Sequence, residues 1–225
     1  MRYIKLFFLI VLLSFINVTL VNAQLLTESE KVTLQERVKQ KVEEFQSSLS
    51  KIVLINENST ASAHKNNKEQ VALLLNLFIG RCEPYEYYDE ELGINVKNSG
   101  VKMQTSSVKS GKGNNDAQKV SNQKMKNYIY RFYNPETGKS RLPYTKIIIE
   151  AANAVRVDNI ERVGDHYECM AYFCQKFIGY RDGKVYYSDV TSKKIRCYIK
   201  SIPTNSGIVW DAKLGDVYVL STEKY

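Results

Sequence analysis

The periodicity of the apolar residues changes along the chain, and this change most limits the folds open to it. Before about residue 134, apolar residues recur at steps of three and four, which is typical of amphipathic helices. After about residue 146, apolar and polar residues alternate, which is typical of strands with one buried and one wet face. This order predicts an α+β fold in which N-terminal helices pack on one face of a curved antiparallel sheet.

The first helix has a clear start signal. The sequence Thr27-x-x-Glu30 is a capping box, so the helix should begin near Glu28. The apolar residues that follow at steps of four and three predict its buried face: Val38, Val42, Phe45, Leu49 and Ile52.

Two further helices and two polar segments complete the first part. A polar loop is expected over 56–66, after which Asn67 can cap a second helix that Gly80 ends. The segment 105–123 has almost no large apolar residue and is rich in Ser, Gly, Asn and Lys, so we expect an exposed, mobile polar insertion there. Apolar residues at helical spacing predict a third helix after it: Met125, Tyr128, Ile129 and Phe132.

Four antiparallel strands are expected in the second part. Turns are predicted at 164–165, at 181–184 with a second turn near 189–192, and at 203–207, and the last strand should be broken near 214–216. Alternation assigns these inward faces to the first three strands: Ile147, Ile149, Ala151, Asn153, Val155 and Val157; Tyr167, Cys169, Ala171, Phe173, Gln175 and Phe177; and Ile195, Cys197 and Ile199.

This order of elements, from about Leu34 to the C-terminus, and the segment QKFIGYRDGKVYYSDVT at 175–191 carry a family resemblance. The chain resembles exported NTF2-like (cystatin-like, cone-shaped) proteins of Bacteroidota, in which such a segment follows the penultimate long strand. The resemblance implies one domain over residues 24–225. It also implies that an enzyme of this family would place an Asp, often with a His or Tyr, inside the cone.

The N-terminus indicates export. Residues 1–23 combine a short basic start, an apolar run and small or branched residues before Gln24, as a cleaved signal peptide does. Cleavage between Ala23 and Gln24 would leave a periplasmic or secreted protein with no stable membrane span, because the apolar run is shorter than the about 20 residues that a span needs. The formal charge would fall from +8 to +6 with the loss of Arg2 and Lys5, a modest value that does not indicate nucleic-acid binding.

The assigned inward faces contain no Asp, Glu or His, which argues against acid–base catalysis and against an enzyme. Their strongly polar members are Asn153 and Gln175, which together with Phe173 are the candidate ligand-binding residues for a small apolar ligand. The alternative is that the two amides are structural hydrogen-bond partners. If Gln175 lay on the solvent side instead, Glu168 and His166 would face inward.

The four cysteines permit disulfides in an exported chain. Cys169 and Cys197 lie on the inward faces of strands expected to be neighbours, so they are the candidate disulfide pair, although free buried thiols fit equally well. No C-x-x-C pair occurs and the histidines are His64 and His166, so neither a metal site nor another cofactor is predicted.

An acidic, tyrosine-rich stretch offers a candidate surface for a partner. Tyr85, Tyr87 and Tyr88 could contact an envelope protein, or their rings could cover the mouth of the cone. These features favour a non-catalytic binding or assembly module of the bacterial envelope. Two alternatives remain: a small cone-pocket enzyme of isomerase or hydrolase type, and a structural subunit of a secretion or conjugation apparatus.

Overall fold

The computed structural model describes residues 26–55, 58–89, 94–109 and 117–224, so the expected signal peptide lies outside the described residues. The chain divides into two compact units, residues 1–32 and 33–225. Among the described residues, the helices lack an apolar stretch of the length that a membrane span requires.

Helix α2 (Glu28–Ser50) begins where the capping box predicted. The amide of Glu30 donates to Thr27 Oγ1 at 3.2 Å, and the amide of Thr27 donates to Glu30 Oε2 at 2.8 Å. Beyond residue 32, α2 buries its predicted apolar face, and Ile52 is buried just after its last turn. The prediction of this helix is therefore confirmed at its start and along its face.

Helix α3 (Ala61–Leu77) begins earlier than predicted, and the loop expected over 56–66 is wrong from residue 61 onward. Its N-cap is Thr60, whose Oγ1 accepts a hydrogen bond from the amide of Ala63 at 3.2 Å. Asn67 lies inside the helix and is fully buried. Its side chain holds the backbone of Val53 through both Oδ1 and Nδ2, at 3.0 and 2.7 Å. Asn67 was predicted to cap α3, but it lies inside the helix and links it to the segment after α2 by hydrogen bonds.

The remaining helices are short. A 3-10 turn, η1 (Ile79–Cys82), follows α3, and Gly80 there has a φ of +58°, which agrees with the predicted stop. Helix α4 (Met125–Phe132) confirms the third helix and buries all four of its predicted apolar residues.

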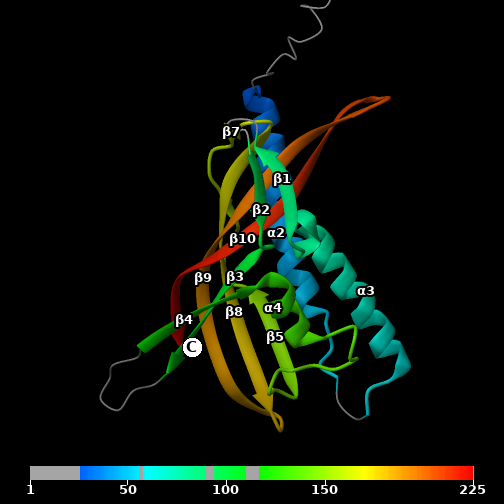
Figure 1. Ribbon diagram of the computed structural model, residues 1–225. Coiled ribbons are helices and arrows are strands. Elements are labelled where there is room, and N and C mark those ends of the chain that lie inside the picture. The colour runs from blue at the N-terminus through cyan, green and yellow to red at the C-terminus, as the bar shows by residue number, and fades with distance from the viewer. Residues whose placement is uncertain (1–25, 56–57, 90–93, 110–116, 225) are drawn as a thin grey trace, which may run out of the picture. The chain divides into compact units, whose positions relative to one another are not determined.

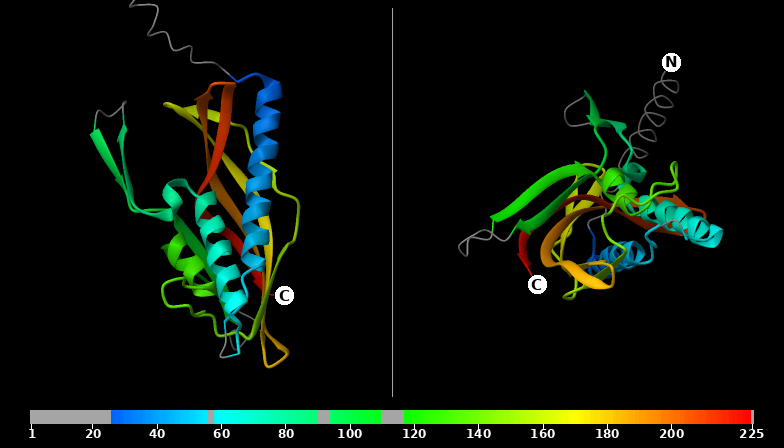
Figure 2. Two further views of the ribbon diagram at one scale, coloured as in Figure 1. Left: turned by 90° about the vertical axis from the view of Figure 1, so that its right-hand side faces the viewer. Right: turned by 90° about the horizontal axis from the view of Figure 1, so that it is seen from below.

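One large sheet, drawn in Figures 1 and 2, contains eight strands. The strands are β3 (Lys102–Lys109), β4 (Ala117–Lys124), β5 (Lys146–Ala151), β6 (Arg156–Val157), β7 (Glu161–Val163), β8 (His166–Arg181), β9 (Lys184–Thr204) and β10 (Gly207–Lys224). Their order is β4-β3-β10-β9-β8-β5, with β6 and β7 also on β8, and every pairing is antiparallel except that of β3 with β10. A separate hairpin joins β1 (Tyr85–Asp89) to β2 (Ile94–Asn98).

Helices α2 and α3 run along one face of this sheet within the second unit (Figures 1 and 2). Gln46 and Ser50 on α2 donate to the backbone oxygens of Cys174 and Ile149 on β8 and β5, at 3.5 and 2.6 Å. The rings of Phe45 and Phe78 meet edge to face, with centroids 5.3 Å apart. The core therefore lies between the helices and the inward face of β8–β10, and the α+β fold is confirmed.

The loop expected over 105–123 is wrong for most of its length, because β3 and β4 form an antiparallel hairpin there. Its strands carry hydroxyl and amide side chains instead of alternating apolar ones, so the usual period-two signal is missing. Mobility of this insertion stays a prediction, and residues 110–116 at its centre lie outside the described ranges.

Three strand predictions need correction. The turn expected near 189–192 is wrong, because β9 runs unbroken from Lys184 to Thr204. The first strand was predicted to continue past residue 151, but β5 ends there, and Asn153 is exposed instead of inward. Its Oδ1 accepts a hydrogen bond of 2.6 Å from the amide of Cys174. The inward register of β8 is confirmed. The break predicted near 214–216 is wrong, because β10 runs unbroken from Gly207 to Lys224, and its pairing with β9 shifts register between Leu214 and Val217 instead.

Candidate ligand-binding pocket

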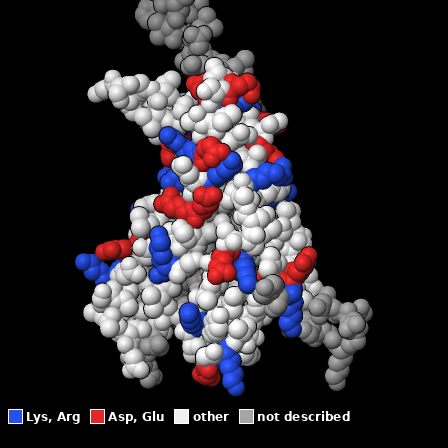
Figure 3. All heavy atoms as spheres, turned by 180° about the vertical axis from the view of Figure 1, so that it is seen from behind, with Lys and Arg blue, Asp and Glu red and all other residues white. Residues whose placement is uncertain are grey.

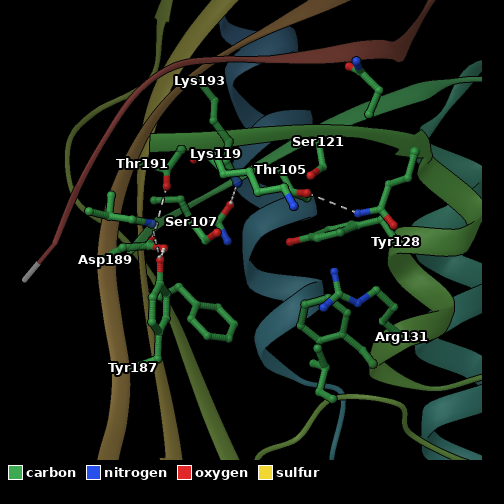
Figure 4. A pocket seen from close by; sticks show the side chains of 18 of the residues that line it. Thr105, Ser107, Lys119, Ser121, Tyr128, Arg131, Tyr187, Asp189, Thr191 and Lys193 are labelled. Atoms are coloured by element: carbon green, nitrogen blue, oxygen red, sulfur yellow. Dashed lines mark hydrogen bonds between the residues drawn. The ribbon is translucent and has the colours of Figure 1, made fainter. Parts of the chain in front are cut away.

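A cavity of about 650 Å³ opens between β8–β9 and the β3–β4 hairpin, and α4 closes one side of it. The strands β8 and β9 supply Gln175, Phe177, Tyr187, Asp189, Thr191 and Lys193. The hairpin supplies residues 105–108, Lys119 and residues 121–123. Tyr128, Arg131 and Phe132 of α4, with Leu142 and Tyr144 after it, complete the lining (Figure 4).

A buried carboxylate lies on the β9 wall. Asp189 is 5% exposed, and both of its oxygens accept hydrogen bonds from side chains on the same strand. Tyr187 Oη donates to Oδ2 at 2.6 Å, and Thr191 Oγ1 donates to Oδ1 at 3.2 Å (Figure 4). Because β-strand side chains alternate, residues 187, 189 and 191 share one face, which is the cavity face.

The protonation of this carboxylate is set by opposing effects. Burial raises the pKa of Asp189, while the hydrogen bond from Tyr187, the charge of Lys193 and the hydrogen bond from Thr191 lower it. Burial also raises the pKa of Tyr187, and its bond to Asp189 acts in the same direction. Tyr187 therefore remains a neutral donor to the carboxylate at physiological pH.

A buried ammonium group lies on the same wall. Lys193 is 6% exposed, and its Nζ donates a 3.0 Å hydrogen bond to Gln175 Oε1 on β8. Burial lowers the pKa of Lys193 to about 8, although the charge of Asp189 opposes this shift. A cation is costly to bury, so its position beside a cavity calls for an explanation beyond packing.

The opposite side of the cavity carries two more cations. Figure 4 shows Lys119 from β4 and Arg131 from α4 extending into the space near the hydroxyl of Tyr128. Burial raises the pKa of Tyr128 to about 12, and Gln175 opposes the rise through a hydrogen bond. The charged side chains of the lining are therefore three basic ones and one acidic one.

The floor of the cavity is aromatic. The ring of Tyr144 lies against Gly179, where an added Cβ would come within 2.5 Å of Tyr144 Cε1. Tyr144 also contacts Phe177 with ring centroids 5.6 Å apart, and Phe177 contacts Tyr187 at 6.2 Å. Gly179 thus makes room for a ring that forms part of the floor.

The three candidate ligand-binding residues lie in three different environments in the structure. Gln175 is buried on the inward face and lines the cavity, as predicted. Phe173 is buried in the core two residues away, and Asn153 is exposed and bonded to the backbone of β8. Asn153 and Gln175 are therefore not partners of each other, and Asn153 is not a cavity residue.

The premise that the inward faces contain no titratable acid is wrong. Asp189 and Lys193 both face inward, and they were missed because Ser188-Asp189 and Thr191-Ser192 have the composition of a turn. The sequence did contain a signal for their inward orientation. Residues 187, 189, 191 and 193 lie at steps of two before Ile195, so in a continuous strand they share its inward face. Glu168 and His166 lie on the opposite face of β8 from Gln175, where they form a 3.0 Å hydrogen bond.

Cys169 and Cys197 lie on neighbouring strands with both side chains on the inward face, as predicted. Cys169 and Cys197 are directly opposite each other on β8 and β9, and both are buried free thiols. A hydrogen bond with Cys169, together with burial, holds the pKa of Cys197 well above its ordinary value. The disulfide stays a prediction.

Within the described residues, no three His, Cys, Asp or Glu side chains gather as a metal site.

The tyrosine-rich stretch forms strand β1. Tyr85 is half-buried and its ring lies over Gly80, where a Cβ would come within 2.9 Å of the ring. Tyr87 pairs with Val96 and Tyr88 with Asn95 through the backbone. The side chains of Tyr87 and Tyr88 lie outside the described part, so the partner surface stays a prediction.

The site is thus a cavity with an aromatic floor, a wall of hydroxyl and amide groups, and a buried network of Asp189, Lys193 and their partners. Comparison with models of protein families, with curated proteins and with solved structures finds no match to this chain.

Proposed function

We propose that this protein is an exported binding module that holds a small polar molecule in the cavity between β8–β9 and the β3–β4 hairpin, without chemically changing it. The observation that carries the proposal is the burial of Asp189 and Lys193 beside an open cavity of about 650 Å³. Folding alone would favour apolar side chains at these positions, because buried charges cost stability. Cavities of 300–1,000 Å³ with a few convergent polar groups are typical small-molecule sites.

The composition of the lining supports a polar ligand over the apolar one that the sequence suggested. Four charged side chains and the hydroxyl groups of β3, β4 and β9 face the space. An apolar ligand would leave these groups without water and without replacement hydrogen bonds, at about 1–3 kcal/mol for each unsatisfied group.

Two neighbouring substitutions on β4 test the proposal. Ser121 lines the cavity, whereas Val120 is 46% exposed on the same strand and is not among the lining residues. A screen of small polar metabolites by thermal unfolding should find compounds that stabilise the wild type and Val120→Trp but not Ser121→Trp, whose indole fills the space. A ligand present at 100 times its Kd stabilises by about 2.7 kcal/mol. Equal stabilisation of both variants would contradict the proposal.

Export forms part of the proposal and rests on the sequence of residues 1–23. Mass spectrometry of the protein from cell fractions should find Gln24 as the N-terminus in the periplasm or the medium. A chain that keeps residues 1–23 in the membrane fraction would contradict export.

A second candidate function is proton-transfer catalysis in the same cavity. Asp189 favours it, because a buried carboxylate of raised pKa can accept and return a proton. Metabolite mixtures incubated with the wild type and with Asp189→Asn separate the two functions. Conversion of a compound by the wild type alone would establish an enzyme, whereas unchanged compounds that still bind support the binding module.

We also propose that the fold is a variant of the NTF2-like cone. The order of helices before long antiparallel strands, with α2 and α3 along one face of the sheet (Figures 1 and 2), supports this assignment. The parallel pairing of β3 with β10 and the β1–β2 hairpin are additions to it. An experimental structure in which β8–β10 form a flat sheet, without a concave side, would contradict the assignment.

A further inference from the structure

The charges of the cavity are unbalanced in favour of cations. Asp189 already accepts hydrogen bonds at both oxygens from Tyr187 and Thr191, so its charge is partly satisfied without a cation. In the described ranges, no carboxylate forms an ion pair with Lys119, Arg131 or Lys193. On the face shown in Figure 3, by contrast, basic and acidic side chains lie interspersed.

These three cations come from different elements and reach one space. Lys193 is on β9, Lys119 on β4 and Arg131 on α4, and Figure 4 shows the last two extending into the cavity. Lys193 has three N–H donors, and Gln175 accepts one of them. Lys193 is buried, whereas Lys119 and Arg131 are exposed, and an anion between three like charges would stabilise all of them.

The acidic group that suits this arrangement is a carboxylate. Phosphate sites commonly use a helix N-terminus, but the first three residues of α4 do not line the cavity, and its lining residues are Tyr128, Arg131 and Phe132. The cations are separate side chains on opposite walls, and such groups can each donate to one of the two oxygens of a carboxylate.

The β3–β4 hairpin and the floor define the rest of the ligand. Ser107 and Ser121 offer hydroxyl groups to the cavity, and Asn122 offers an amide. Such side chains donate and accept hydrogen bonds, as hydroxyl groups on a ligand require. The rings of Phe177 and Tyr144 offer an apolar surface against which the C–H face of a saturated ring can lie.

We propose that the cavity binds a cyclic, hydroxylated carboxylate, with its carboxylate among Lys193, Lys119 and Arg131 and its hydroxyl groups against the β3–β4 hairpin. This inference rests on the proposed binding function and names its ligand class. The lowered pKa of Lys193 fits it, because burial disfavours the charged form and an anion beside the ammonium group would favour it.

Three probes that share a six-membered ring test the proposal: D-glucuronate, D-glucose and cyclohexanecarboxylate. Calorimetric titration of the purified protein should show glucuronate binding at least about tenfold more tightly than either of the other two, as one charge-assisted contact would provide. Equal affinity for glucose would overturn the carboxylate contact, and equal affinity for cyclohexanecarboxylate would overturn the hydroxyl contacts. Absence of binding by all three would overturn this inference, while the metabolite screen with Ser121→Trp judges the binding function separately.

Neighbouring lysines on β9 provide the matched variants. Lys193→Met should abolish the preference for glucuronate over glucose, whereas Lys194→Met, on the other face of the strand and beside the ring of Tyr218, should keep it. Arg131→Gln, at an exposed position, gives a second test that does not alter the buried network and should weaken glucuronate binding. A preference that survives both Lys193→Met and Arg131→Gln would overturn the assignment of the cation site.

Discussion

Lys193 on β9 donates a 3.0 Å hydrogen bond to the side-chain oxygen of Gln175 on β8, and both side chains are buried. This bond joins the one inward-facing amide that the sequence identified correctly to a cation that it missed. Both side chains line the cavity, and their hydrogen bond joins β8 to β9. A substitution of either one should therefore change both the stability of the sheet and the chemistry of the cavity.

Gln175→Leu should therefore destabilise the protein, because it leaves the buried ammonium group without its acceptor. The expected cost is about 1–3 kcal/mol in the free energy of unfolding. Urea unfolding measures it, and Gln175→Leu combined with Lys193→Met should recover most of the loss, since both polar partners are then replaced. A single variant as stable as the wild type would show that the bond contributes nothing.

The contribution of Lys193 to the stability of the protein should rise with pH above about 8. Burial lowers the pKa of Lys193 in the folded state to about 8, below its ordinary value of 10.5. Above pH 8 the folded state therefore binds fewer protons than the unfolded state, and stability increases with pH. Between about pH 8 and 9.5, the wild type should gain stability relative to Lys193→Met. A pH-independent difference between the two would contradict the burial of a titrating ammonium group.

Affinity for an anionic ligand should change in the opposite direction. A bound carboxylate favours the charged form of Lys193, so glucuronate affinity should fall as the pH rises through about 8. Titrations at several pH values measure this dependence, and Lys193→Met is the control that should lack it. An affinity of the wild type that stays constant across this range would contradict a contact between Lys193 and the ligand.

Gly179→Ala should destabilise the floor of the cavity, since the new Cβ would lie 2.5 Å from Tyr144 Cε1. Overpacking of this kind costs about 1–3 kcal/mol. In a background of Tyr144→Ser, which removes the ring, the same change should cost much less. Thermal unfolding of the four proteins in this cycle measures the coupling, and additive effects would show that Tyr144 does not lie over Gly179.

Oxidation should join Cys169 to Cys197 before any other pair, because they face each other across β8 and β9. Directly opposite residues of antiparallel strands have Cα atoms about 4.5–5.5 Å apart, within the range of disulfides. Peptide mapping without reduction identifies the bond. A link from Cys169 to Cys82 or Cys174 would refute the pairing.

The elements that were predicted well are those whose apolar residues follow a period. The face of α2 and the register of β8 both bury one side against the core, so the pattern of apolar residues reveals them. The start of α2 was also marked locally by the capping box at Thr27, and the end of β8 by the turn at 181–184.

The elements that were missed carry polar residues on a buried or cavity face. Asn67 looks like a cap, yet it bridges to the backbone of Val53 inside α3. Asp189 and Thr191 look like a turn, yet they face a cavity inside a long strand. Patterning treats polar residues as exposed, so it fails where a site requires buried polar groups, and the site was hidden for that reason.

The contents of the cavity provide the most direct test of the binding function. A crystal structure of the protein purified from its own cells should show a small molecule between β8–β9 and the β3–β4 hairpin, with an acidic group within hydrogen-bond distance of Lys193. A structure in which the hairpin packs directly on Asp189 and Thr191, so that no cavity remains, would contradict the account.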